Sequence, residues 1–297
     1  MDYLLLTLAT VSSSGKALFC KVIGAAKGRA VYLANFKAFL VAALVAVLFT
    51  LGELPGIFEV SPFTLGLSVI FAGSVFMTQV TQTKAMALGP ASLTTLIYSA
   101  SCLVPVAFGA VFWGEAVSPV QWIGVGVMAV ALFLIVWERD GNAVNKRWLL
   151  YVIPASLGSG TNAVLQKIHQ FSDYRQELKF FLLFALLFSA GFSLAGYLLP
   201  QRGEETAEQP KQKPMLRKER LWTLSPIPLG IFVGFLNFLN LMLAGRLPSV
   251  VQFPVYNIGS LILTGVISAI AFRERLSPRK LAGCAAGMAA ILLIGMF

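Results

Sequence analysis

Charge is scarce in this sequence, and its scarcity excludes the ordinary soluble classes. Only 12% of the 297 residues are charged, whereas 57% are hydrophobic. A soluble domain of this length needs a polar surface, and this chain has too few polar residues to supply one. Most of its surface must therefore face membrane lipids, and the sequence predicts an integral, multi-pass protein of the cell membrane.

Groups that perform catalysis or hold metals are just as rare within the apolar runs. No acidic residue falls in the middle of a run, and the only histidine, His169, lies at the end of one. The three cysteines show no metal-ligand spacing. Acid–base or metal chemistry inside the membrane would need such groups, so we expect neither an enzyme nor a cofactor. The net charge of +10 resides in the loops, so nucleic acid is not an expected partner.

Ten apolar runs have the length of about 20 residues that crosses a bilayer. They cover 3–24, 32–52, 63–86, 91–113, 119–137, 148–168, 179–199, 222–244, 249–271 and 279–297. The sequence therefore predicts an all-α polytopic membrane protein. The tryptophans fall near the ends of these runs, where an aromatic belt is expected. The long polar segment 200–221 is expected to be a flexible loop.

The second half of the chain repeats the first. Residues 88–124 align with 246–283, and residues 11–22 align with 157–168. The alignment pairs Lys21 with Lys167, Pro90 with Pro248, Tyr98 with Tyr256, Glu115 with Glu274, and Ser118-Pro119 with Ser277-Pro278. We predict two five-helix repeats, 1–138 and 147–297. Because five is odd, the second repeat enters the membrane from the opposite side, which makes an inverted repeat around a midplane cavity.

The distribution of lysine and arginine predicts the orientation. With ten crossings both termini lie on one face, and sorting the basic residues places 18 opposite the termini and four beside them, with Lys16 left inside the membrane. Basic residues of short loops stay in the cytoplasm, so the count places both termini outside. Lys21 and Lys167, near helix ends, are interpreted as interface anchors.

The ordered set of motifs resembles a known family. Each half opens with a small-residue helix that ends in lysine, and the fourth helix starts after Gly-Pro or Leu-Pro and closes on the motif Gly-Glu-x-x-Ser-Pro, which stands at 114–119 in the first half. This resembles the ten-helix EamA-type family of the drug/metabolite transporter superfamily. The resemblance implies a secondary transporter or exporter of small metabolites, amino acids or drugs that works by alternating access. Two features differ: Arg273-Glu274 replaces the usual Gly-Glu, and the family's usual cytoplasmic termini conflict with the charge count.

Polar residues inside membrane spans are costly and mark candidate sites. Lys16 lies well inside the first run, and its repeat mate is Asn162. It is interpreted either as a cation that binds an anionic solute or as a snorkelling lysine. Each half also presents a carboxamide pair 11 and 8 residues before its Pro90 or Pro248, and these pairs are Gln79 with Gln82 and Asn237 with Asn240. Such amides either line the cavity or join helices.

A third duplicated set is Tyr98-Ser99 and Tyr256-Asn257, near Pro105 and Pro254, which are expected to loosen their helices. Gln166, on the face of Asn162, completes the predicted substrate-binding residues. Serines and glycines of the first helices, Ser13 and Ser159 among them, are interpreted as allowing close helix approach. Glu115 and Glu274 would lie on opposite faces of the membrane, and are interpreted as turn or gating elements.

The sequence thus predicts a secondary transporter or exporter of a small-molecule solute, with amino acids or small organic anions as the expected class. The alternatives are a multidrug efflux transporter and a non-transporting structural or lipid-moving protein. A carboxylate-driven proton antiporter is disfavoured because the spans carry a lysine in place of an acid. A monomer or a homodimer is expected.

Overall fold

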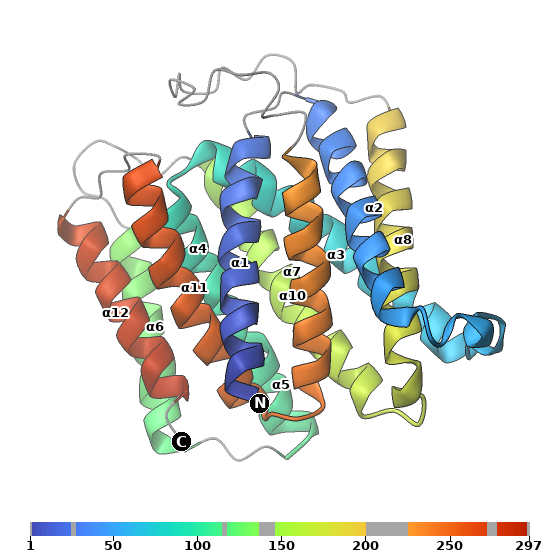
Figure 1. The fold of residues 1–297 in the computed structure, drawn as a ribbon. Coiled ribbons are helices and arrows are strands. Elements are labelled where there is room, and N and C mark those ends of the chain that lie inside the picture. The colour runs from blue at the N-terminus through green and yellow to red at the C-terminus, as the bar shows by residue number, and fades with distance from the viewer. Residues whose placement is uncertain are drawn as a thin grey trace.

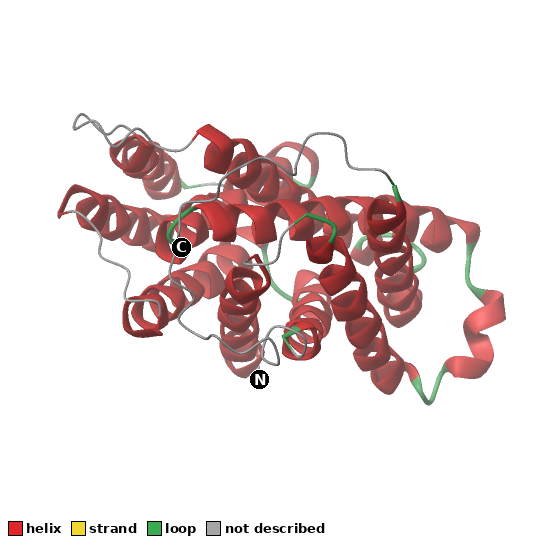
Figure 2. Ribbon diagram, turned by 90° about the horizontal axis from the view of Figure 1, so that it is seen from above, coloured by secondary structure: helices red, strands yellow, loops and turns green. Residues whose placement is uncertain are grey.

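A computed structural model describes residues 2–24, 28–114, 118–136, 146–199, 225–271 and 278–295. Within these ranges the chain is helical and no strand occurs (Figure 2). Nine crossings are unbroken helices: α1 (Asp2–Gly24), α2 (Ala30–Thr50), α3 (Pro62–Leu88), α6 (Pro119–Val136), α7 (Lys146–Gln170), α8 (Leu178–Leu198), α10 (Pro226–Ala244), α11 (Ser249–Ala271) and α12 (Pro278–Gly295). Each predicted apolar run corresponds to one helix or, for 91–113, to a divided one, and six of the described spans are long and apolar enough to cross a membrane. The predicted all-α membrane fold is therefore confirmed.

The fourth crossing is divided, and a proline explains where. It consists of α4 (Ala91–Ser99), the short 3-10 turn η2 (Ala100–Cys102) and α5 (Leu103–Phe112). Pro105 has no amide hydrogen to donate to the carbonyl four residues earlier, so the regular helix is interrupted at that level. The loosening predicted at Pro105 is therefore seen. At Pro254 the helix α11 continues without a break, although this proline likewise donates no hydrogen bond to the carbonyl four residues earlier.

The helices form one bundle in which the two halves interlock. Figure 1 shows α6 and α12 at one edge and α2 and α8 toward the other, with α1, α3, α4, α7, α10 and α11 between them. α3 packs on α7 as α1 packs on α10, and α8 packs on α3 as α2 packs on α10. Exchanging the two halves of the chain converts each of these pairs into the other. The inner six helices therefore provide an interior shared by both halves.

Contacts at one face show that α1 and α7 run in opposite directions. Lys21, at the end of α1, donates to the Gly89 carbonyl over 3.2 Å, and Trp148, at the start of α7, donates to Thr94 Oγ1 over 3.0 Å. Gly89 and Thr94 are neighbours around the start of α4, so the end of one helix meets the start of the other. This is the direction that an inverted repeat requires. We call the face where α1 begins the terminal face.

Burial corrects two sequence interpretations at these helix ends. Lys21 is 7% exposed and Lys167 is 1% exposed, so neither is a surface-facing interface anchor. Trp148 is 4% exposed and lies against Gly89, so it belongs to the interior and not to the aromatic belt. Trp122, which is 61% exposed, matches the belt expectation.

A stripe of small residues lets α2 and α10 approach closely. Ala34, Ala38, Ala42 and Ala46 recur every four residues along the buried face of α2. Gly230 and Gly234 of α10 lie against the backbone carbonyls of Ala38 and Ala42. Helices in lipid gain little from the hydrophobic effect between them, so their association depends on such close packing.

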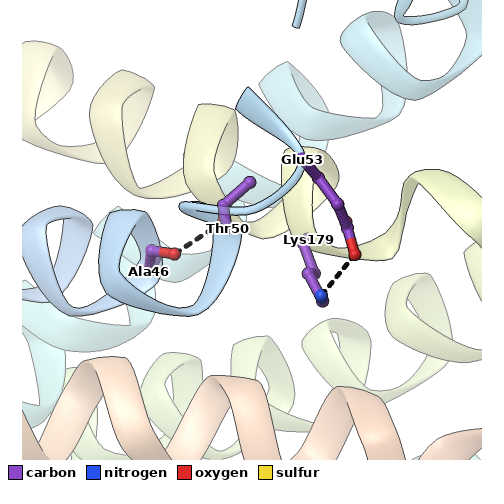
Figure 3. A network of polar contacts seen from close by, with 4 residues as sticks. All are labelled: Ala46, Thr50, Glu53 and Lys179. Carbon is purple, nitrogen blue, oxygen red and sulfur yellow. Dashed lines mark hydrogen bonds and ion pairs between the residues drawn. The ribbon is translucent and has the colours of Figure 1, made fainter. Parts of the chain in front are cut away.

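Polar contacts at the terminal face join the α2–α3 connection to the start of α8. The Lys179 ammonium forms a 2.5 Å ion pair with Glu53 (Figure 3). Glu53 lies about one turn after Thr50, whose hydroxyl donates a hydrogen bond to the Ala46 carbonyl. The backbone amide and hydroxyl of Ser61, which caps α3, both donate to Glu177 Oε2, over 3.1 and 2.7 Å. These contacts link the first half of the chain to the second.

The predicted helix start at Ser118-Pro119 is confirmed. The Gln121 amide donates to Ser118 Oγ over 3.3 Å, while the Ser118 amide donates to Gln121 Oε1 over 2.7 Å. This reciprocal pair is a capping box, and Pro119 occupies the first helical position, where proline is favoured. Glu115, Glu274 and Ser277 lie outside the described residues.

Candidate functional site

A cavity lies between the six inner helices, and its lining is mostly polar. The polar lining residues are Ser13, Lys16, Thr78, Gln79, Tyr98, Ser159, Asn162, Gln166, Asn237, Asn240 and Tyr256. The apolar ones are Val75, Ala163, Val233, Leu236 and Phe253. The cavity volume is about 40 Å³. Both halves of the chain contribute to it.

Lys16 is the only charged residue in this lining. It is 8% exposed, and its ammonium group donates to the Tyr98 hydroxyl over 3.3 Å. The same ammonium lies 5.3 Å from the centre of the Tyr98 ring, within the range of a cation–π contact. Lys16 therefore reaches into the cavity beside α4 and does not extend along α1 toward a membrane interface.

The structure divides one of the two predicted carboxamide pairs: Gln79 lines the cavity without Gln82, whereas Asn237 and Asn240 both line it. Gln79 and Asn237 both line the cavity. Each forms a hydrogen bond with a residue on the first helix of its own half, which is α1 for Gln79 and α7 for Asn237. Gln79 Nε2 donates to Cys20 Sγ over 3.2 Å, and Gln166 Nε2 donates to Asn237 Oδ1 over 3.4 Å. The repeat alignment pairs Cys20 with Gln166, so the two contacts are equivalent.

The second residues of the two pairs, Gln82 and Asn240, differ in whether they line the cavity. Asn240 lines the cavity, and its Oδ1 atom is buried without a hydrogen-bond partner. Gln82 is 2% exposed but does not line the cavity, so the structure does not place it in the predicted site. It lies almost one turn closer to the end of α3, beyond the level of the cavity.

The two residues of each duplicated motif, Tyr98-Ser99 and Tyr256-Asn257, also face different surroundings. Tyr98 and Tyr256 line the cavity, whereas Ser99 and Asn257 do not. Asn257 Nδ2 instead contacts the Ser99 carbonyl over 3.5 Å, which joins α4 to α11. Consecutive helical residues point in directions about 100° apart, so the residue after a cavity-lining tyrosine faces an adjacent helix.

Asn162, the repeat mate of Lys16, lines the cavity from α7. Its Nδ2 atom donates to Thr78 Oγ1 over 3.4 Å, and its Oδ1 atom is buried without a hydrogen-bond partner. The site therefore combines one ammonium donor with two unpaired amide acceptors, those of Asn162 and Asn240. Such a lining can bind an anionic group at Lys16 and accept hydrogen bonds from amino or hydroxyl groups elsewhere.

Sequence reasoning assigned some lining residues to another role or omitted them. Ser13 and Ser159 were interpreted as packing residues, and they do join helices: Ser260 donates to Ser13 over 2.9 Å, and Ser101 donates to Ser159 over 3.3 Å. They also line the cavity. Ser13 and Ser159 occupy equivalent positions in the repeat, and this equivalence is the sequence signal that could have assigned them to the cavity. Thr78 and Phe253 were not singled out, because an isolated threonine or phenylalanine in an apolar run carries no pattern.

Comparison with known proteins gives a family and a shared fold. The model of the EamA-like transporter family matches residues 146–296, which is half of the chain and spans α7 to α12. No curated protein matches the chain. One crystal structure of a protein is similar with a TM-score of 0.67 and 17% sequence identity, over 98% of this chain and 95% of the other. At that identity the likeness concerns the fold alone, and it extends over both halves.

Proposed function

Because the chain belongs to the EamA-like transporter family, we propose that it is a secondary transporter that moves small polar metabolites by alternating access around the cavity at Lys16. The solutes that we propose are amino acids or small organic anions. The observation that carries the proposal is a buried ammonium group in a lining that contains no carboxylate.

The sign of the cavity's charge selects among solute classes. A carboxylate placed 4 Å from the Lys16 ammonium gains about 4 kcal/mol at an effective dielectric constant of about 20. A cationic solute at the same place loses a similar amount. The difference favours anions and zwitterions, and it disfavours the multidrug alternative for lipophilic cations. The polar lining also offers little surface to a large apolar drug.

The unpaired acceptors support the same solute class. Asn162 Oδ1 and Asn240 Oδ1 are buried carbonyl oxygens without partners, and such groups are costly to leave unsatisfied. A protonated amine or a hydroxyl on the solute would satisfy them, while the solute's carboxylate pairs with Lys16. The donor and the acceptors come from α1 and from α7 and α10, so a solute would bridge the two halves of the chain.

The size of the cavity supports alternating access. A cavity of about 40 Å³ is small for a metabolite, and separation of the inner helices in the proposed cycle would enlarge it. In the proposed cycle one face opens at a time, and the site at the interface between the halves is exposed first to one side and then to the other.

Counterflow into liposomes tests this proposal. The full chain is reconstituted, and uptake of labelled L-alanine, succinate and the neutral analogue succinamide is measured. Lys16→Met should slow succinate exchange at least tenfold, while Lys16→Arg should retain part of it. Lys37→Met, which removes an exposed lysine of α2, is the matched control and should leave all rates unchanged. The proposal fails if the folded wild-type protein exchanges none of these solutes.

A further inference from the structure

His169, the only histidine in the sequence, is buried near the end of α7 and does not line the cavity. It is 0% exposed, and its imidazole ring stacks on that of Phe181 in α8 with the ring centres 4.4 Å apart. It follows the cavity-lining residue Gln166 by three positions, so it lies on the same side of α7 about 4.5 Å nearer the terminal face. The proposed binding of anions at Lys16 leaves this titratable group without a role.

The two ring nitrogens of His169 have unequal surroundings. Nε2 lies 3.4 Å from Thr64 Oγ1, which is within hydrogen-bond distance. Nδ1 is buried and has no hydrogen-bond partner in the described part of the chain. A neutral imidazole has one N–H donor and can direct it from Nε2 to Thr64, whereas a protonated imidazole has two donors. Protonation in this position would therefore add a donor and a charge where the packing supplies no acceptor, and burying such a group is costly.

Hydrogen bonds connect the imidazole to a carboxylate beyond the end of α7. Thr64 Oγ1 lies 3.0 Å from the Ser61 hydroxyl, and the Ser61 hydroxyl and amide both donate to Glu177 Oε2. The second half of the chain supplies His169 and Glu177, and the first half supplies Thr64 and Ser61. We call these four residues the terminal latch. Because it joins the two halves, the terminal latch has to break if they separate at the terminal face.

Glu177 is the charged residue of the neighbouring elements that acts on the imidazole. It is partly exposed, so solvent screens its charge, and its Oε2 atom already accepts both donors of Ser61. It therefore offers a protonated His169 only an indirect attraction, through Thr64. The other charged residues near this end of the bundle are exposed, paired or turned to other partners: Asp2, Glu53, Glu59, Lys167, Asp173, Arg175, Lys179 and Arg246.

We propose that His169 is a proton-binding site that releases the terminal latch. The neutral imidazole fits the closed form described here, whereas the protonated imidazole needs water at Nδ1, which reaches it when the halves separate. A proton therefore binds the open form of the terminal face better and shifts the equilibrium toward it. This inference rests on the proposed function only for the solute that passes through the opening.

The sign of the pH dependence follows from this difference in proton binding. An exposed histidine has a pKa of about 6.5, so above that pH neither form binds the proton and the closed form keeps its full stability. As the pH falls below about 6.5, the open form gains a proton that the closed form does not accommodate. The ratio of open to closed protein then rises by up to about tenfold per pH unit.

The distance between two spin labels tests the terminal latch separately from transport. Phe58→Cys, at a residue that is 95% exposed in the first half, and Asp173→Cys, at an exposed residue of the second half, are labelled in the full chain. The three native cysteines are buried, and the unsubstituted chain serves as the labelling blank. Between about pH 7.5 and about pH 5.5, the fraction of molecules with a longer distance should rise up to about tenfold.

Variants of His169 assign this response to the imidazole. His169→Gln keeps a donor for Thr64 and cannot be protonated, so its distances should be the same at both pH values. His169→Asn is a second uncharged replacement and keeps the test decisive if the first variant does not fold. Glu59→Gln removes an exposed acid near the terminal latch and should retain the response. An unchanged distance in the labelled wild-type background, or a response that persists in a folded His169 variant, overturns the proposal.

Counterflow of L-alanine in liposomes separates failure of the latch from failure of the proposed function. Alanine keeps the same charge over this pH range, so a pH dependence of its exchange reports on the protein. The exchange rate should vary with pH in the wild-type protein and be independent of pH in His169→Gln. Equal pH profiles of the two proteins would count against control of the terminal face by His169. If no solute exchanges, the proposed function fails, whereas the spin-label distances still decide the latch.

Discussion

Adding one methyl group at Gly230 should separate two helices that hold the halves of the chain together. A methyl group in place of a Gly230 hydrogen would stand 2.3 Å from the Ala38 carbonyl oxygen and 2.6 Å from Val41 Cβ. Carbon and oxygen atoms in proteins approach to about 3.3 Å at closest. The backbones of α2 and α10 must therefore move apart by about 1 Å in Gly230→Ala, since the obstacle is a carbonyl and not a flexible side chain.

The size of the effect follows from the packing that this movement loses. A gap of 0.5–1 Å forfeits about a quarter to a half of each dispersion contact across the interface. Overpacked interiors are typically destabilised by about 1–3 kcal/mol. Alanine is a better helix former than glycine by about 1 kcal/mol, which offsets part of this cost. We expect Gly230→Ala to be destabilised by up to about 2 kcal/mol.

The chain contains natural cysteines that can report unfolding and a second helical glycine that serves as a control position. Cys20, Cys102 and Cys284 are all free and buried, so a thiol-reactive fluorescent dye reports thermal unfolding without added labels. Gly66 is also helical, but a methyl group there meets no atom within 4 Å. Gly66→Ala should therefore melt at or above the wild-type temperature, and Gly230→Ala should melt several degrees lower. Equal melting of the two variants would refute the close approach of α2 and α10.

Two other substitutions test the charges. Asn162→Asp places a carboxylate in the same cavity as Lys16, so it should abolish succinate exchange in liposomes; unchanged exchange would show that the cavity's net charge does not select the solute. Glu53→Gln removes a surface ion pair whose two side chains are 33% and 47% exposed, and such pairs contribute only about 0–1 kcal/mol. Its melting temperature in the thiol assay should stay within a few degrees of the wild-type value, and a larger fall would mean that this contact holds the two halves together.

Most of the fold was predictable because lipid imposes a simple rule on sequence. Every crossing needs about 20 apolar residues, so the ten runs appear directly in the composition of the chain. The break in the fourth crossing was predictable at Pro105, because that residue removes a backbone donor. The continuity of α11 at Pro254 was not, because the sequence shows the same residue type at a position where the helix continues.

The site was predictable to the extent that burial in a membrane is costly for polar groups. Eight of the predicted substrate-binding residues line one cavity: Lys16, Gln79, Tyr98, Asn162, Gln166, Asn237, Asn240 and Tyr256. Gln82, Ser99 and Asn257 are equally polar and buried, but they join helices or lie beyond the level of the cavity. Sequence alone records that a side chain is polar within a span. It does not record which neighbour that side chain faces, because facing depends on how the helices are rotated in the bundle.

The duplication places matched residues around the cavity and leaves one charge unmatched. Tyr98 and Tyr256, Gln79 and Asn237, and Ser13 and Ser159 are repeat mates that all line it. The pair formed by Lys16 and Asn162 is different, because one half supplies an ammonium group where the other supplies an amide. In the proposed alternating-access cycle, matched residues would let each half move as the counterpart of the other. The one unmatched charge would then orient the proposed solute, with its anionic group toward α1 and α4. Exchanging the two residues, as Lys16→Asn with Asn162→Lys, should therefore preserve anion exchange better than Lys16→Asn alone. If the double variant is as inactive as the single one, the position of the charge matters beyond its presence, and the surrounding Tyr98 contact is required as well.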